Sequence, residues 1–310
     1  MHRALLALML VVATPVAARA GYLSGVHAFN SGDFETAYEE LAPLADSGNA
    51  SAQYYIGQMY LTGRGVERDE HRAFDYLSTA AESGDARAQV NLGLMYESGR
   101  VVERDLSQAA EWFSEAAEAG LPFAQTKLGV LYQRGEGVAQ DYARALQLYE
   151  SAAAQEDVYA IRNLGYLYEN GLGVPQDFAA AEEWYRRAIT DGYPGAMNNL
   201  AWMLASRHDR LDEALDLAEQ AVDVHPSPTF IDTRGYVHFQ RGEYDLAIAD
   251  YERSLNMFDG DWTVIDRLGD AYLGAGQVDR ARETWQRAAE AAPEGAERDA
   301  LMAKIASHQS

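Results

Sequence analysis

Apolar residues recur along the chain with the period of amphipathic helices. In the stretch AQVNLGLMY, Leu92, Met95 and Tyr96 stand at positions i, i+3 and i+4 and share one helix face. The stretch DLSQAAEWFSEAAEAG that follows has the same period, and its apolar side chains are Ala109, Trp112, Phe113 and Ala116. The pattern predicts two helices joined by a polar loop.

Local signals mark the ends of these helices. Asp105 is expected to cap the second helix, because its carboxylate can accept hydrogen bonds from N–H groups of the first turn. Gly120 is expected to end that helix. Gly93 lies inside the first helix, where glycine costs about 1 kcal/mol relative to alanine. We therefore expect the two helices to approach each other closely at Gly93.

The same pattern returns every 36 residues, which is the signature of a helical repeat. Six columns keep this step: Gly57, Gly93, Gly129 and Gly165; Tyr60, Tyr96, Tyr132 and Tyr168; Val66, Val102, Val138 and Val174; Asp69, Asp105, Asp141 and Asp177; Ala73, Ala109, Ala145 and Ala181; Ala80, Ala116, Ala152 and Ala188. Through NLGLMYESG, then RD, then AAEWFSEAAEAG, these units resemble the Sel-one-like repeat family from Ala50 to Tyr193.

Other repeats flank these four units. The segment GVHAFNSGDFETAYEELAPLADSGN lacks the long loop and is interpreted as an opening repeat. After Tyr193 the period shortens to 34, and RGYVHFQRGEYDLAIADYERSL and RLGDAYLGAGQVDRARETWQRAAEAAP resemble tetratricopeptide repeats. The resemblance implies an all-α fold, a right-handed α-α superhelix (solenoid) of helix-turn-helix repeats. The expected organisation is a signal peptide (1–20), a short opening repeat (21–49), four Sel-like repeats (50–193), three tetratricopeptide-like repeats (194–293), and a capping helix with a tail (294–310).

Glycine-rich loops join the two helices of each Sel-like unit. They read TGRGV, SGRVV, RGEGV and NGLGV in four successive units. A phosphate-binding loop normally occurs once, after a strand and with a following lysine, and none of these loops has that context. We interpret the glycines as turns that add two residues to the 34-residue unit. In the second unit, Val101 replaces the second glycine, so either that position needs no positive φ or this loop takes another path.

The start of the chain has the composition of an export signal. His2 and Arg3 precede the apolar run ALLALMLVVA, and Ala18 and Ala20 form an A-x-A pattern. This order predicts a signal peptide cleaved after Ala20. The chain contains no Cys, which excludes disulfides and thiol nucleophiles and favours a bacterial periplasm, with a Gram-negative source expected.

Charge and motifs narrow the function further. The formal net charge of −23 argues against nucleic acid or anionic lipid as a partner, although acidity that serves only solubility is an equal alternative. No catalytic motif occurs, no histidine pair has metal-ligand spacing, and the DGD at 259–261 lacks the remaining ligands of a calcium loop. We expect no enzyme, no metal and no cofactor.

The concave face of such a solenoid is lined by the first helix of each repeat and can bind an extended peptide or a partner helix. In similar tetratricopeptide proteins, contact positions lie around the Leu-Gly pair of that helix. The candidate partner-binding residues are Tyr54, Tyr55, Asn91, Lys127, Arg162, Asn163, Tyr166, Asn198, Asn199, Trp202, Asp232 and Tyr236. The asparagines can pair with a peptide backbone, or they can bond between adjacent helices. Asp232, Asp266 and Asp270 predict an acidic C-terminal groove that favours a basic or neutral segment.

The sequence thus favours a non-catalytic scaffold or regulator of the bacterial cell envelope that binds another protein or peptide. No membrane span is expected in the mature chain. The alternative is a cell-envelope enzyme or a protein that binds β-lactams or peptidoglycan, which some cysteine-rich Sel-like relatives suggest. That alternative requires a pocket with a nucleophile or with carboxylates of perturbed pKa.

Overall fold

The computed structural model describes residues 18–190 and 192–308, and the statements below concern this part of the chain. The predicted signal peptide, residues 1–20, falls almost entirely outside it. All regular structure in the described residues is helical. The prediction of an all-α repeat fold is therefore confirmed.

The chain divides into two compact parts, one ending at Asp157 and one beginning at Val158. In the N-terminal part, residues 18–31 are helical and precede α2 (Phe34–Asp46), α3 (Ala50–Thr62), α4 (Glu70–Glu82), α5 (Ala86–Ser98), α6 (Leu106–Glu118), α7 (Pro122–Arg134) and α8 (Tyr142–Ala153). The C-terminal part holds α9 (Val158–Asn170), α10 (Phe178–Thr190), α11 (Pro194–Ser206), α12 (Leu211–Val224), α13 (Pro228–Gln240), α14 (Tyr244–Met257), α15 (Trp262–Gly274), α16 (Val278–Ala291) and α17 (Ala296–Ser307).

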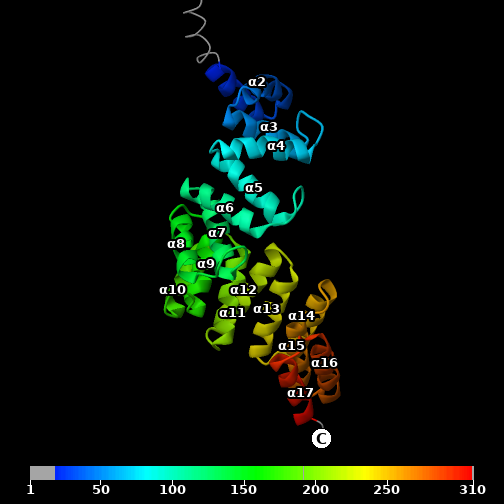
Figure 1. The fold of residues 1–310 in the computed structure, drawn as a ribbon. Coiled ribbons are helices and arrows are strands. Elements are labelled where there is room, and N and C mark those ends of the chain that lie inside the picture. The colour runs from blue at the N-terminus through cyan, green and yellow to red at the C-terminus, as the bar shows by residue number, and fades with distance from the viewer. Residues whose placement is uncertain (1–17, 191, 309–310) are drawn as a thin grey trace, which may run out of the picture. The chain divides into compact units, whose positions relative to one another are not determined.

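Within each part, consecutive helices pack against one another in pairs (Figure 1). We call α3, α5, α7, α9, α11, α13 and α15 the A helices, and the helix that follows each of them its B helix. The helix α17 packs against α16 and closes the series. The change of repeat length near residue 193 lies inside the C-terminal part.

The predicted helix ends are confirmed. Asp105 accepts hydrogen bonds from the backbone N–H groups of Ser107 at 2.9 Å and Gln108 at 3.1 Å, and so caps α6. Gly120 follows α6 with a φ of 89°, in the left-handed region that glycine adopts without strain. The sequence of α6 therefore encodes its own start and stop.

The glycine inside each A helix makes the predicted close approach. A Cβ atom on Gly93 would lie 2.6 Å from the ring of Phe113 on the paired B helix. The same contact joins Gly57 with Leu77, Gly129 with Tyr149, Gly165 with Tyr185, Gly235 with Tyr251 and Gly269 with Trp285. The repeated glycine is thus required by packing, which outweighs its cost in the helix.

The spacing of these contacts corrects the expected loop length. In the Sel-like repeats the contacting side chain lies 20 residues after the glycine, whereas in the last two repeats it lies 16 residues after it. The Sel-like loop is thus four residues longer, not two. The return from the B helix to the next A helix is two residues shorter, 16 from Phe113 to Gly129 against 18 from Tyr251 to Gly269.

The second glycine of the loop also serves packing. Gly65, Gly137 and Gly173 have φ values of 74°, 71° and 72°, whereas Val101 does not have a positive φ. The loop of the second repeat therefore takes another path. A Cβ on Gly137 would lie 2.2 Å from the carbonyl oxygen of Leu106, at the start of the preceding B helix. This glycine lets the loop pack against the previous repeat.

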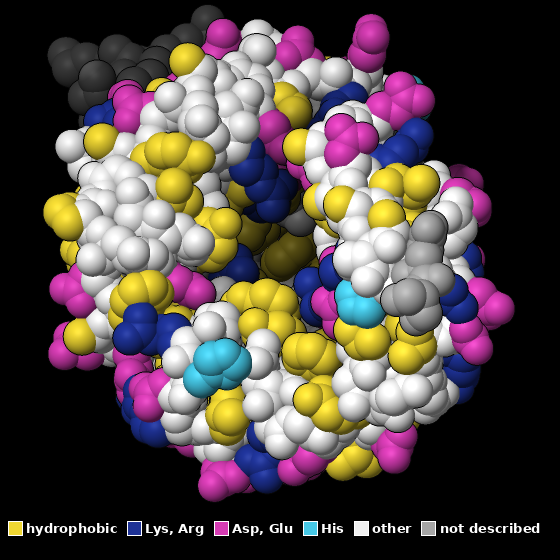
Figure 2. All heavy atoms as spheres, turned by 90° about the horizontal axis from the view of Figure 1, so that it is seen from below, with side chains coloured by type: hydrophobic (Ala, Val, Ile, Leu, Met, Phe, Trp, Pro, Cys, Tyr) yellow, Lys and Arg dark blue, Asp and Glu magenta, His cyan; other side chains and the backbone are white. Residues whose placement is uncertain are grey.

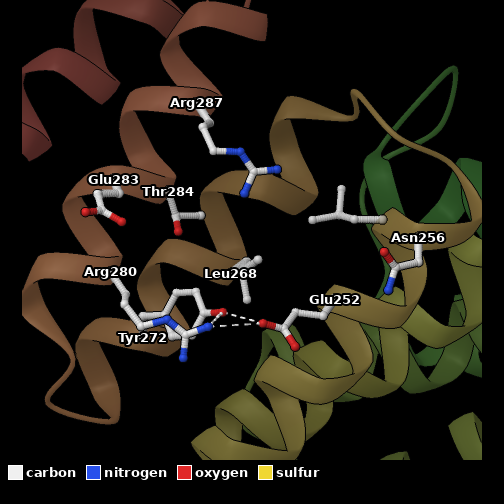
Figure 3. Close-up of a pocket in the computed structure, with 9 residues that line it drawn as sticks. Glu252, Asn256, Leu268, Tyr272, Arg280, Glu283, Thr284 and Arg287 are labelled. Atoms are coloured by element: carbon white, nitrogen blue, oxygen red, sulfur yellow. Dashed lines mark hydrogen bonds and ion pairs between the residues drawn. The ribbon is translucent and has the colours of Figure 1, made fainter.

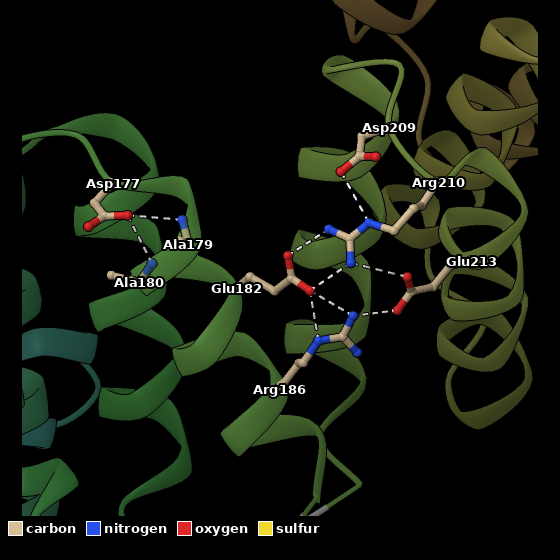
Figure 4. Close-up of polar contacts among 8 residues, drawn as sticks. All are labelled: Asp177, Ala179, Ala180, Glu182, Arg186, Asp209, Arg210 and Glu213. Atoms are coloured by element: carbon tan, nitrogen blue, oxygen red, sulfur yellow. Dashed lines mark hydrogen bonds and ion pairs between the residues drawn. The ribbon is translucent and has the colours of Figure 1, made fainter.

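Where the repeat length changes, the turn between α11 and α12 has no glycine. His208 and Arg210 instead adopt positive φ values of 50° and 42°. The side chain of Arg210 binds Glu182 of α10 at 2.6 Å, and Arg186 also binds Glu182, at 2.7 Å (Figure 4). Glu213 joins both arginines to complete the network. This turn therefore has an ion-paired residue, Arg210, in a left-handed conformation, whereas the other turns from an A helix to its B helix have glycine.

Few charged side chains are buried in the described residues, and Asp85, Asp232 and Asp250 are among them. Figure 2 shows acidic side chains dispersed around the visible face and interspersed with arginine and lysine. In residues 18–190 and 192–308, no helix combines the length and the apolar character that a bilayer crossing requires.

Candidate partner-binding surface

The repeat places the candidate residues of the C-terminal part in two rows on the A helices. The polar row consists of Arg162, Asn198, Asp232 and Asp266, which occupy the same register in α9, α11, α13 and α15. The aromatic row consists of Tyr166, Trp202 and Tyr236, each four residues further along the same helix. Because residues four apart share a helix face, the two rows run side by side.

The aromatic row forms an amphipathic strip. The rings of Trp202 and Tyr236 stack with centroids 4.2 Å apart and planes 24° apart. Both side chains are half-buried, and Tyr166 is 39% exposed. Exposed aromatic side chains of this kind are the usual anchors of protein interfaces, because they bury a large area with few rotatable bonds.

Asp232 of the polar row, in contrast, is used in an internal ion pair. It is buried and accepts hydrogen bonds from Arg267 at 2.8 and 3.1 Å, and the Arg267 guanidinium lies 5.4 Å from the Trp202 ring centroid. Burial raises the pKa of Asp232 to about 6, although Arg267 acts in the opposite direction. The ion pair therefore lies next to Trp202 of the aromatic row.

The predicted acidic groove is not available to a basic partner. Lys304 of α17 binds Asp266 at 2.5 Å and Asp270 at 2.7 Å, and the indole N–H of Trp285 also donates to Asp270. Arg267 occupies Asp232. Each of the three carboxylates therefore has an internal cation, and the expected preference for a basic segment loses its basis.

The asparagines of the C-terminal part differ in their surroundings. Asn163 is buried and accepts a hydrogen bond from Arg162 at 2.7 Å. Asn199 is half-buried and lies near Tyr185, whose pKa is raised mainly by burial, whereas Asn199 acts to lower it. Asn198 is buried, and its Oδ1 atom has no hydrogen-bond partner among the described residues. Of these three asparagines, Asn198 alone has a buried polar atom without a partner among the described residues.

In the N-terminal part, the predicted tyrosines are covered by a neighbouring arginine. The Arg87 guanidinium lies 4.2 Å from the ring centroid of Tyr54 and 5.1 Å from that of Tyr55. Arg87 also binds Asp85 at 2.6 Å. Burial raises the pKa of Tyr54. Both tyrosines remain partly exposed, and the charge of Arg87 is neutralised by Asp85. The two rings and Arg87 therefore form an ordered surface patch without an unpaired charge.

Asn91 and Lys127 connect adjacent A helices. Gln58 of α3 donates to Asn91 at 2.9 Å, and the Asn91 side chain donates to the carbonyl oxygen of Arg87 at 2.8 Å. Lys127 of α7 binds Glu97 of α5 at 2.7 Å. Asn91 thus follows the helix-bridging alternative, Lys127 also joins neighbouring helices, and the polar groups of both are already in use.

A groove on the other side of the repeat was not predicted from the sequence. It lies between the B helices α14 and α16, has a volume of about 380 Å³, and has Leu268 of α15 on its floor (Figure 3). Tyr272 and Arg280 contact Glu252 at one end, and Arg287 lies apart from them. A smaller groove between α6 and α8 uses the same repeat positions, so the feature belongs to the repeat architecture.

Carboxylates of raised pKa occur, but each has a packing partner. Burial raises the pKa of Glu169, which accepts a hydrogen bond from the Tyr185 hydroxyl at 2.6 Å. Burial also raises the pKa of Asp270, which forms an ion pair with Lys304. Within residues 18–190 and 192–308, no group of three or more His, Asp or Glu side chains is placed to hold a metal ion.

Comparison with known families agrees with this architecture. Paired helices in register, with a glycine contact in nearly every pair, define a helical repeat protein. The Sel1 repeat family matches residues 50–85, 86–121, 122–157 and 158–193, and tetratricopeptide repeat families match residues 195–225 and 238–305. The chain is a Sel1-like repeat protein of the tetratricopeptide repeat superfamily. This fold is consistent with a protein-interaction scaffold, and its families are generally non-catalytic.

Solved structures share the fold. The antigen c5321 of uropathogenic Escherichia coli is 26% identical with a TM-score of 0.70, over 88% of this chain and 61% of that chain. A Sel1 repeat protein from Oxalobacter formigenes is 28% identical with a TM-score of 0.66, over 73% of this chain and 96% of its own. PilW, a type IV pilus biogenesis factor, is 22% identical with a TM-score of 0.53, over 60% and 85% of the two chains, and shows the fold alone. No curated protein matches the chain.

Proposed function

We propose that this protein is a non-catalytic scaffold or regulator of the bacterial cell envelope, exported to the periplasm, that binds a peptide segment of a partner protein on its A helices. The observation that carries the proposal is the aromatic row of α9, α11 and α13. Tyr166, Trp202 and Tyr236 expose aromatic surface in register on successive helices. A row of aromatic side chains on successive helices suits an extended chain better than a compact small molecule.

Site-specific photocrosslinking tests the binding face. A photoreactive phenylalanine analogue placed at Tyr166 is expected to capture a partner in cells that express the full chain. The matched control is Leu246, which is 53% exposed on the B helix α14 and lies outside the aromatic row. Capture at Leu246 but not at Tyr166 would place the interface on the B helices and contradict the assignment of the A-helix face.

Export is tested separately. The basic start, the apolar run and the A-x-A pattern of residues 1–20 support cleavage after Ala20. The protein recovered from a periplasmic extract is expected to begin at Gly21, which N-terminal sequencing would show. Recovery of the intact chain in the cytoplasmic fraction alone would refute the periplasmic assignment while leaving the binding function open.

A further inference from the structure

One positive charge on the A helices of the C-terminal part has no counter-charge. Among the described residues, Asp232 pairs with Arg267, Arg234 pairs with Asp250, and Lys304 takes both Asp266 and Asp270. Arg162 of α9 is half-buried, and no acidic side chain among the described residues lies within ion-pair distance of it. An arginine withdrawn from water without a carboxylate is costly unless a ligand supplies one.

Arg162 also lacks a hydrogen-bond acceptor, among the described residues, for one of its N–H groups. One terminal nitrogen donates to Asn163 at 2.7 Å, but the Nε atom is buried and donates to nothing. Glu169, on the same helix, is directed to Tyr185, and only burial and the Tyr185 hydroxyl act on its pKa. In the described part of the chain, Arg162 therefore has a buried N–H donor without a partner as well as an unpaired charge.

A second orphaned polar group lies in the same row. Asn198 occupies on α11 the register that Arg162 occupies on α9, is only 7% exposed, and has an Oδ1 atom without a partner. An unpaired buried acceptor costs about 1–3 kcal/mol, so its retention beside the aromatic row points to a ligand that donates to it. The ligand must then bring both a negatively charged acceptor and an N–H donor.

We propose that Arg162 and Asn198 form an anchor for an acidic residue, aspartate or glutamate, within the extended peptide that binds the aromatic row. The side-chain carboxylate binds Arg162, and a backbone N–H beside it donates to Asn198. Tyr166 and Trp202, one turn further along, contact an apolar or aromatic residue beside the acid.

This inference rests on the proposed peptide-binding function and names the chemistry of the peptide. Its test begins with random dodecapeptides, displayed with their C-termini fused, selected on the full chain. Wild type is compared with Arg162→Gln and with the matched control Arg253→Gln. Arg253 is an exposed arginine of α14 that likewise has no acidic partner among the described residues, so both variants remove one positive charge. A thermal melt of each variant checks that the fold is retained.

Wild type and Arg253→Gln are expected to enrich Asp or Glu at a fixed distance from an aromatic or apolar residue, and Arg162→Gln is expected to lose that enrichment. A selected peptide, synthesised with both ends blocked, then gives the affinity. Replacing its Glu by Gln is expected to weaken binding to wild type about tenfold or more and to Arg162→Gln by about twofold or less, because a charge-assisted hydrogen bond is lost only in the first case.

The remaining outcomes separate the two proposals. If peptides are enriched without an acidic position, or if binding needs a free C-terminal carboxylate instead, the anchor is wrong and the peptide-binding function stands. If wild type enriches no peptide beyond a variant with both Trp202 and Tyr236 changed to alanine, both proposals are overturned.

Discussion

The Sel1-like and the tetratricopeptide-like repeats reach the same contact by different routes. In both, a glycine of the A helix lies against a large side chain of the B helix, Phe113 for Gly93 and Trp285 for Gly269. The chain between them is 20 residues in one case and 16 in the other. What is kept is the contact between the paired helices, and what varies is the loop that connects them.

The longer loop has a packing role that the shorter turn lacks. Gly65 and Gly137 lie against the backbone oxygens of Phe34 and Leu106, the first residues of α2 and α6. Gly276, in the last short turn, has a φ of 77° but open space where a Cβ would be. The Sel1-like loop therefore contributes to the stacking of repeats, whereas the tetratricopeptide-like turn only reverses the chain.

The largest effect is expected where the loop glycine is replaced. Gly137→Ala combines an unfavourable φ with a Cβ 2.2 Å from the Leu106 oxygen, whereas Gly276→Ala has the φ alone. We expect the first to lower the free energy of unfolding by about 3 kcal/mol or more and the second by about 1 kcal/mol. Urea denaturation of both variants measures the difference. Equal losses would show that the loop does not pack against the preceding repeat.

The contact that both kinds of repeat share predicts equal penalties. In Gly165→Ala the new Cβ lies 2.6 Å from the Tyr185 ring, and in Gly269→Ala it lies 2.4 Å from the Trp285 ring. We expect each to destabilise by about 1–2 kcal/mol, because overpacking exceeds the gain in helix propensity.

Ala201 provides the control for this pair. It holds the same column in α11, where the chain already accommodates a methyl group. Ala201→Gly is therefore expected to cost about 1 kcal/mol through helix propensity. If Gly165→Ala or Gly269→Ala proved stabilising in the same urea titrations, the close approach would not be the reason for the glycine.

The junction between the two kinds of repeat depends on ion pairs. Arg210 and Arg186 lower the pKa of Glu182 to about 2. Since the folded pKa lies below the ordinary value of 4.5, the stabilisation is present above pH 4.5 and is lost as the pH falls toward 2. Glu182→Gln is expected to lower stability at pH 7 by about 1 kcal/mol or less, because the network is solvent-exposed.

The pH dependence makes this prediction specific. The melting temperatures of Glu182→Gln and wild type are expected to converge as the pH is lowered from 5 to 3. The control is Glu290→Gln, on an exposed side chain of α16 with no ion-pair partner among the described residues. A gap between Glu182→Gln and wild type that is unchanged at low pH would show that the carboxylate does not stabilise the junction electrostatically.

The sequence was sufficient to predict the fold because each local signal has a single physical solution. The aspartate at the position of Asp105 caps a helix, and the glycine at the position of Gly93 allows close packing. Each is a weak signal in one copy, but its recurrence at a fixed spacing makes the prediction of the repeat firm. The loop length was mispredicted because the period gives only the length of the whole repeat. The longer loop within a Sel1-like repeat is partly offset by a shorter connection from its B helix to the next A helix. The path of the loop at Val101 depends on backbone angles that no residue pattern encodes.

The surface was harder to predict, because exposure and partner choice are set by neighbouring repeats. Register alone placed Tyr166, Trp202 and Tyr236 together, but it also predicted free acids at Asp266 and Asp270. Lys304 reaches them from a helix 34 or more residues away, a pairing without a local signal. The separation of bridging from unsatisfied asparagines likewise appears only in the structure.

The smallest expected change in stability concerns Asn91 and Asn198. It distinguishes an asparagine that stabilises the fold from one that is free to bind a partner. Asn91 makes two hydrogen bonds, so Asn91→Ala is expected to cost about 1 kcal/mol. The Oδ1 atom of Asn198 has no partner, so Asn198→Ala is expected to leave stability within about 0.5 kcal/mol of wild type or to raise it slightly. Urea titration of both variants gives the comparison. A loss at Asn198 as large as that at Asn91 would mean that Asn198 is a structural residue, and the stability argument for its role in binding would fail.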